Sequence, residues 1–163
     1  NGSDLNPPWT VEVWFKSISN THNSTLLWRC GSPCWALKLL QYNNTKKIGI
    51  TKYGNTDWKW NYITSVGKWE HVVWVGKNNN VELFVNGVSK GTKNLSNAKL
   101  YWKYIGKANG TLTIHGEIDE LRIWNDARTA TEIKSNMFKE LEGNESNLKA
   151  YYKMSNGSGT TLI

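Results

Sequence analysis

Three aromatic residues alternate with polar ones between positions 57 and 62, a spacing suited to binding sugars. In an extended strand, Trp58, Trp60 and Tyr62 share one face at intervals of about 7 Å. Flat rings in such a row can stack on the apolar C–H faces of successive sugar rings, while neighbouring polar side chains bond the hydroxyls. The predicted ligand-binding residues are Trp58, Lys59, Trp60, Asn61, Tyr62 and Trp102.

The alternative is that these rings belong to a hydrophobic core. The chain has ten tryptophans in 163 residues, and large aromatic side chains bury well inside a β-sandwich. Apolar residues are few between positions 54 and 62, which favours exposure of the row. Both interpretations stay open on the sequence.

Two cysteines, Cys30 and Cys34, flank the tripeptide Gly-Ser-Pro, which is typical of a turn. Strand-like runs lie on either side, so a disulfide that closes a hairpin is the natural prediction. Such a bond requires an oxidising compartment. A zinc site would need further Cys or His nearby, and none is present.

Charge is unevenly distributed along the chain, whose net charge is +7. The stretch 38–107 holds twelve lysines against three acidic residues, whereas 117–145 holds eight acidic residues. A basic middle could attract an acidic polysaccharide. Lysine can also serve only as a solvated edge residue that opposes aggregation, and we favour this second explanation.

Other chemistry has little support. The three histidines, His22, His71 and His115, form no recognisable metal or catalytic spacing, and no glycine-rich phosphate loop is present. No run of eighteen apolar residues occurs, so we predict no membrane insertion. We predict no nucleic-acid partner either.

Short strands must position these residues, because apolar and polar side chains alternate along most of the chain. Turn residues such as Asn86-Gly87 separate the runs and predict hairpins. The predicted strands cover 9–16, 25–30, 35–40, 47–53, 58–63, 67–75, 81–87, 100–106, 111–115, 116–125 and a segment after 147.

One helix is predicted near 130–141. Thr129 and Glu132 have the spacing of a capping box, in which each side chain bonds a free amide of the first turn. Ile133, Met137 and Leu141 follow at helical spacing.

The order of four segments resembles the laminin-G-like branch of the concanavalin A-like jelly rolls. They are Trp-Thr-Val-Glu-Val-Trp-Phe-Lys (9–16), Gly-Lys-Trp-Glu-His-Val-Val-Trp-Val (67–75), Val-Glu-Leu-Phe-Val-Asn-Gly (81–87) and Gly-Glu-Ile-Asp-Glu-Leu-Arg-Ile-Trp-Asn (116–125). The resemblance implies an all-β fold, a two-sheet antiparallel jelly-roll sandwich. It implies one domain over 1–163, which we expect to be an excised module of a longer secreted protein.

The same broad fold includes laminarinase-type glycoside hydrolases, whose catalytic strand carries Glu-x-Asp-x-x-Glu. Glu117 and Asp119 match the first two positions, but the third is Arg122. A retaining glycosidase needs two carboxyls about 5 Å apart, one of which donates a proton. Arginine cannot serve as that acid, and Glu120 should point to the opposite face from Asp119. We therefore predict no enzyme activity.

Jelly-roll lectins often hold a structural calcium ion. Calcium takes six to eight oxygen ligands, including carboxylates. The resemblance therefore makes Asp119 and Asp4 the candidate metal ligands.

Two functions follow from these observations. The first is a non-catalytic, lectin-like module that binds an oligo- or polysaccharide, with acidic glycans as an option, on a secreted or cell-surface protein. The alternative is an adhesive or structural spacer that binds a protein partner or no ligand. Both imply an extracellular location, and the sequence does not specify an oligomeric state.

Overall fold

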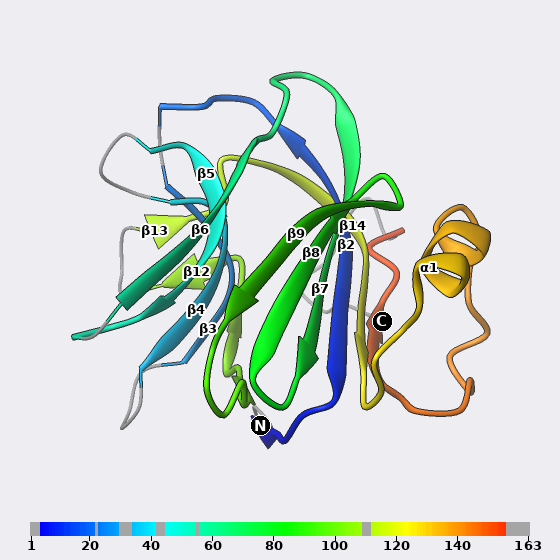
Figure 1. Cartoon of the computed structure of the whole chain (residues 1–163). Coiled ribbons are helices and arrows are strands. Elements are labelled where there is room, and N and C mark those ends of the chain that lie inside the picture. The colour runs from blue at the N-terminus through cyan, green and yellow to red at the C-terminus, as the bar shows by residue number, and fades with distance from the viewer. Residues whose placement is uncertain are drawn as a thin grey trace. The chain divides into compact units, whose positions relative to one another are not determined.

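The computed structural model describes residues 4–21, 23–29, 34–41, 45–54, 56–108 and 112–155. Strands dominate it, as predicted (Figure 1). The chain forms two compact units, each built around one antiparallel sheet. The first comprises Asn1–Leu5, Lys16–Lys68 and Lys99–Glu117, and the second comprises Asn6–Phe15, Trp69–Ala98 and Ile118–Ile163.

The first unit contains a five-stranded sheet in the order β11-β3-β4-β5-β6. Two small ribbons, β1-β10 and β12-β13, accompany it. The strands of this unit are β1 (Asp4–Leu5), β3 (Ser24–Arg29), β4 (Trp35–Leu40), β5 (Lys47–Lys52), β6 (Thr56–Ile63), β10 (Leu100–Tyr101), β11 (Tyr104–Ile105), β12 (Lys107–Ala108) and β13 (Leu112–Thr113). The single strand predicted over 100–106 is therefore two short strands.

The second unit contains most of a six-stranded sheet in the order β15-β14-β2-β7-β8-β9. Its strands are β2 (Trp9–Ser17), β7 (Trp69–Lys77), β8 (Asn80–Val85), β9 (Val88–Asn94), β14 (Gly116–Trp124) and β15 (Leu148–Tyr152). Strand β9 was not predicted because its sequence, Val-Ser-Lys-Gly-Thr-Lys-Asn, has no apolar alternation. It is an exposed edge strand whose position is set by pairing with β8.

The turn between β8 and β9 confirms the Asn-Gly prediction. Asn86 and Gly87 have φ angles of 52° and 71°, which are the left-handed values of a type I′ hairpin turn. Glycine adopts this conformation without a steric penalty. A local sequence signal thus determines where the edge strand returns.

Close packing of a tryptophan ring requires a glycine in the second unit. Trp9 is buried, and its indole N–H donates to the carbonyl oxygen of Ala98. A Cβ atom placed on Gly76 would lie 2.2 Å from the Trp9 ring, closer than any real contact. Glycine is therefore needed in the middle of β7 for space, not for its backbone freedom.

Helix α1 (Ala130–Asn136) begins with the predicted capping box. The Thr129 hydroxyl accepts from the Glu132 amide at 3.2 Å, and the Glu132 carboxylate accepts from the Thr129 amide at 2.8 Å. Ile133 is buried against a core cluster of the same unit, formed by Val73, Val75 and Phe84.

The helix ends at Asn136, five residues before the predicted end. The backbone carbonyls of residues 136, 137 and 139 accept bonds from the side chains of Arg122 and Trp14. These tertiary partners replace the bonds that another helical turn would supply. Among the described residues, no helix is long and apolar enough to cross a membrane.

Candidate functional site

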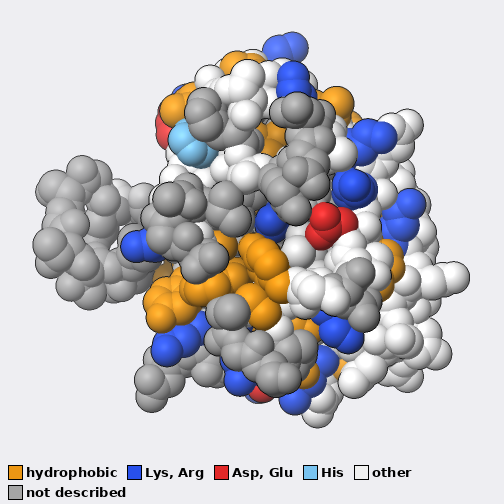
Figure 2. Space-filling model, turned by 90° about the vertical axis from the view of Figure 1, so that its left-hand side faces the viewer, with side chains coloured by type: hydrophobic (Ala, Val, Ile, Leu, Met, Phe, Trp, Pro, Cys, Tyr) orange, Lys and Arg blue, Asp and Glu red, His pale blue; other side chains and the backbone are white. Residues whose placement is uncertain are grey.

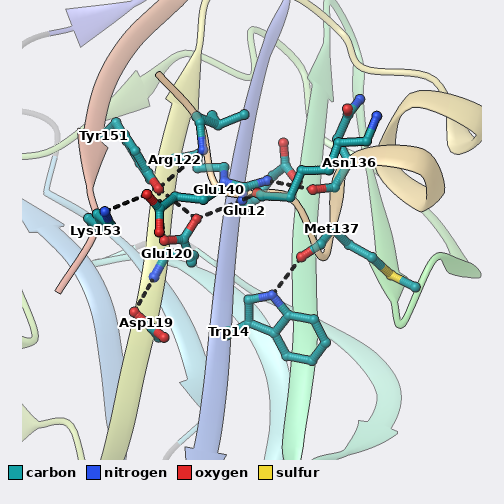
Figure 3. A network of polar contacts seen from close by, with 12 residues as sticks. Glu12, Trp14, Asp119, Glu120, Arg122, Asn136, Met137, Glu140, Tyr151 and Lys153 are labelled. Atoms are coloured by element: carbon teal, nitrogen blue, oxygen red, sulfur yellow. Dashed lines mark hydrogen bonds and ion pairs between the residues drawn. The ribbon is translucent and has the colours of Figure 1, made fainter. Parts of the chain in front are cut away.

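A cavity of about 410 Å³ lies within the second unit, beside the segment that follows α1. Residues from β2, β7 and β14 line it together with that segment. Figure 3 shows several of these residues on β14, on β2 and on the chain after the helix. The lining residues are Trp14, Trp69, Asp119, Glu120, Arg122, Met137, Phe138, Lys139 and Glu140.

Three aromatic side chains form the apolar part of this cavity. Trp69 and Phe138 are 41% and 78% exposed, so both rings are accessible. Trp14 is half-buried, and its ring centroid lies 5.3 Å from that of Phe138. The indole N–H of Trp14 donates to the Met137 carbonyl at 2.8 Å, which fixes the ring and also holds the chain that carries Phe138.

Arg122 holds the segment after α1 that lines the cavity. Its side chain is only 1% exposed. One guanidinium nitrogen donates to the Asn136 carbonyl at 3.1 Å, and the other donates to the Lys139 carbonyl and to Glu120. A planar guanidinium with several fixed donors can hold these groups at once. Arg122 therefore positions the whole segment from 136 to 139.

Glu120 is fully engaged in this network. Its carboxylate lies 2.7 Å from the Arg122 guanidinium and accepts from the Tyr151 hydroxyl at 2.8 Å. Burial, followed by this hydrogen bond, raises the pKa of Tyr151 to about 12, so the hydroxyl stays a donor at neutral pH. Glu120 stabilises the wall and has little capacity left for a ligand.

Asp119 and Glu120 both line the cavity, although neighbouring residues of a regular strand take opposite faces. Glu120 has a φ of 51°, a left-handed conformation that interrupts the regular alternation of β14. Regular strand geometry therefore does not hold at this position.

Asp119 is a carboxylate in this cavity with acceptor capacity to spare. Its Oδ1 accepts from the Glu120 amide at 2.9 Å, and its Oδ2 accepts no hydrogen bond from any residue that the structure describes. Burial raises the pKa of Asp119 above its ordinary value, and the nearby Glu120 charge raises it further. The Glu120 amide and Arg122 oppose this shift. The carboxylate is thus held in a setting that does not favour its charge.

A buried contact between His71 and Glu12 lies next to Trp14. The His71 Nε2 is 3.3 Å from Glu12 Oε2, and both side chains are at most 2% exposed. The His71 ring lies 5.2 Å from the Trp14 ring. His71 therefore supports Trp14 from inside the unit, in agreement with a structural role.

The predicted ligand residues all belong to the first unit, whereas the cavity belongs to the second. Trp60 and Trp102 are buried, at 1% and 7% exposure, which corrects the prediction of an exposed row. Trp58 and Tyr62 are half-buried, as is Lys59, and Asn61 is exposed. The Trp58 ring stacks on Trp35, with centroids 6.0 Å apart and an interplanar angle of 2°.

The physical reason is an irregular register on β6. Gly49 pairs with Lys59, but Lys47 pairs with Ile63, so four residue steps on β6 face two on β5. Extra residues in one strand form a bulge that breaks the alternation of faces. The three rings therefore do not share one exposed face.

Another aromatic pair of the first unit is accessible. Tyr104 is 42% exposed, and its ring centroid lies 5.2 Å from that of Trp28. Lys103 Nζ lies 5.5 Å from the Tyr104 ring. Figure 2 shows hydrophobic side chains gathered near the middle of one face of the molecule, with Lys and Arg side chains around them.

The two candidate metal ligands belong to different units of the chain. Asp4 pairs with Arg29 and lies 3.7 Å from Lys99, so its carboxylate is already occupied by cations. Asp119 belongs to the other unit. Among the residues that the structure describes, no group of three His, Cys, Asp or Glu side chains could hold a metal. Calcium binding stays a prediction.

The predicted Cys30–Cys34 disulfide falls mostly outside the described residues, since these exclude 30–33. The hairpin that it would close is present, because β3 pairs with β4 up to Arg29 and Trp35. The disulfide itself stays a prediction.

Sequence reasoning missed Trp14, Trp69 and Phe138 as site residues. A signal was available for Trp14, which lies between Glu12 and Lys16 on the polar face of its strand. An aromatic residue on a polar face is a candidate for ligand contact. For Phe138, no local pattern distinguishes a cavity wall from the end of a helix.

Comparison with known families places these features in context. A laminin G-type family profile, described as the concanavalin A-like lectin/glucanases superfamily, matches residues 2–134. No curated protein sequence matches the chain.

Several solved structures share the fold. A protein from Bacteroides ovatus, named as a candidate carbohydrate-binding protein, has a TM-score of 0.76 and 18% identity over 98% of this chain and 50% of its own. Domain 4 of the arabinanase AbnA from Geobacillus stearothermophilus, solved with arabinotriose, has a TM-score of 0.64 and 20% identity over 80% and 66% of the two chains. Domains LG4-5 of the mouse laminin α1 chain have a TM-score of 0.57 and 16% identity, over 75% and 36%. The chain thus spans about half of the first of these proteins.

Proposed function

Because the chain belongs to the concanavalin A-like lectin/glucanases superfamily, we propose that it is a non-catalytic carbohydrate-binding module whose ligand occupies the cavity beside Asp119. The module is part of a secreted or cell-surface protein, and its ligand is an oligo- or polysaccharide. Neighbours in fold include a domain solved with arabinotriose, which supports a saccharide as the ligand class.

One observation carries this proposal: the cavity combines accessible rings with a carboxylate that can still accept hydrogen bonds. Trp69 and Phe138 offer flat apolar surfaces, and Asp119 offers an unengaged oxygen. A sugar ring has apolar C–H faces and a rim of hydroxyl donors, so it matches both. The volume of about 410 Å³ lies within the range of small-molecule sites, roughly 300–1,000 Å³.

The carboxyl groups of β14 support binding instead of catalysis. Glu117 is paired with Lys16 at 2.7 Å and Glu120 is engaged by Arg122 and Tyr151, which leaves Asp119 as the β14 carboxyl with an oxygen available in the cavity. Glu140, which also lines the cavity, is paired with Lys153. A glycosidase of the retaining or inverting type uses two carboxyls, one as acid and one as base or nucleophile.

The test is calorimetric titration with a broad panel of neutral and acidic oligosaccharides, alongside tryptophan fluorescence. We expect saturable binding that weakens by about 30-fold in Trp69→Ala and Phe138→Ala, since central aromatic contacts contribute about 2 kcal/mol or more. Tyr104→Ala is the matched control, because Tyr104 is as exposed as Trp69 (42% against 41%) but belongs to the other unit.

Two outcomes contradict the proposal. If no glycan binds to the folded protein, the carbohydrate function fails. If binding is lost in Tyr104→Ala and kept in Trp69→Ala, the site lies on the first unit, where Trp58 and Tyr62 remain predicted contacts.

Asp119→Asn should separate affinity from stability. We expect ligand affinity to fall by about 10- to 100-fold, because a hydrogen bond to a charged group contributes about 1.5–3 kcal/mol. Because the pKa of Asp119 is raised in the folded state, ionisation of this carboxyl disfavours folding. The stability that the protonated carboxyl contributes is therefore lost as the pH rises through the folded-state pKa. The melting temperature at pH 7 should therefore be unchanged or higher in the variant. A clear drop in melting temperature would assign Asp119 a structural role.

An adhesive function is the second candidate, because Ile18, Ile63 and Val66 of the first unit are exposed by 45–61%. Ser17 bridges to Val66, which brings Ile18 close to it. Exposed apolar groups of this kind are suited to a protein partner. The glycan panel decides between the candidates, since an adhesive or spacer domain would leave every saccharide unbound.

A further inference from the structure

We propose that the cavity beside Asp119 selects an amino sugar, a saccharide that carries a protonated amine. This inference rests on the proposed carbohydrate function of the same cavity and specifies the chemistry of the ligand.

Aromatic rings that line a cavity together with a carboxylate favour a cation. Trp14, Trp69 and Phe138 all line the cavity with Asp119, and the Trp14 and Phe138 centroids are 5.3 Å apart. The face of an aromatic ring carries partial negative charge and attracts an ammonium group, with tryptophan the most effective. An amine on a sugar ring could face these rings while the sugar's own C–H surface stacks on them.

The charges of the cavity leave one anion without a cationic partner. Arg122 and Glu120 neutralise each other at 2.7 Å, and Glu140 is paired with Lys153 at 2.5 Å. Asp119 has no ion pair among the described residues, and its one hydrogen bond comes from a backbone amide. A ligand ammonium would therefore give Asp119 the direct cationic partner that it lacks among the described residues.

An ammonium group fits Asp119 better than a hydroxyl does. It would form a charge-assisted hydrogen bond, which is roughly twice as strong as a neutral one. It would also screen the repulsion between Asp119 and Glu120. Burial and that repulsion both raise the pKa of Asp119, and the charge of Arg122 opposes them only in part.

Lys139 is a cation of the cavity lining that opposes this preference. It lines the cavity and is exposed. Its charge should weaken binding of an amine and leave binding of a neutral sugar nearly unchanged. Removing the Lys139 charge should therefore strengthen binding of an amino sugar, which gives the inference a test with a defined direction.

The experiment compares three β-1,4-linked oligosaccharides that differ only in the group at carbon 2: glucosamine, N-acetylglucosamine and glucose oligomers of equal length. The galactosamine series is run in the same way. We expect the amine form to bind at least about tenfold more tightly than its acetylated and hydroxyl counterparts, because only it carries a charge.

Three variants assign the preference to the cavity. Asp119→Asn should abolish it, and Lys139→Gln should strengthen binding of the amine form alone. Lys103→Gln is the matched control, since it removes the same charge from an exposed lysine of the other unit. Equal effects of Lys139→Gln and Lys103→Gln would mean that net charge alone is being measured.

The outcomes separate this inference from the proposed function. Equal or tighter binding of any neutral or acidic glycan overturns amino-sugar selection and leaves the carbohydrate function standing. An amine preference that survives in Asp119→Asn also overturns it. No response to any saccharide overturns both.

Discussion

Replacing Arg122 with methionine is expected to lower the free energy of unfolding by about 3–5 kcal/mol, because it leaves a buried charge without its partner. Glu120 would lose its cation, and the carbonyls of Asn136 and Lys139 would lose their donor. The same carbonyls hold the segment that carries Phe138, so the cavity wall should loosen as well.

Urea denaturation measures the first effect, and trypsin cleavage after the exposed Lys139 measures the second. Arg122→Lys keeps the charge but not the planar set of donors, so we expect partial recovery of stability with faster cleavage than in the unsubstituted protein. The double variant Glu120→Gln/Arg122→Met should be more stable than Arg122→Met alone. Unchanged cleavage and stability in Arg122→Met would show that the segment is held by other contacts, chiefly Trp14.

Trp60→Ala should also be strongly destabilising, by about 3–5 kcal/mol, as expected for removing a large buried aromatic ring. Trp60 is 1% exposed, whereas Trp58 is half-buried on the same strand. For a chain of this size the loss corresponds to a fall in melting temperature of roughly 10 °C.

Thermal unfolding followed by circular dichroism tests this difference, with Trp58→Ala as the matched control. We expect Trp58→Ala to cost clearly less, because part of its ring is already in water. If Trp60→Ala melts like the unsubstituted protein and instead loses saccharide affinity, the Trp60 ring contacts ligand, and the original prediction of an aromatic row is restored.

Local patterns in the sequence determined most of the fold. Alternating residues predicted the main strands, the Asn86-Gly87 pair predicted a hairpin, and Thr129 with Glu132 predicted a capped helix start. Each of these signals depends on residues a few positions apart, so the sequence contains the whole interaction. The resemblance to the superfamily, now shown over residues 2–134, rests on the order of such segments.

The candidate site depended on contacts between distant parts of the chain. The segment that forms its wall is held by hydrogen bonds from distant side chains: Trp14 bonds Met137, 123 positions away, and Arg122 bonds Asn136, 14 positions away. The left-handed backbone at Glu120 and the bulge of β6 both break the alternation from which side-chain faces are predicted. Alternation specifies which face a residue takes in a regular strand, but only the tertiary structure decides where a strand departs from it and which rings then stay exposed.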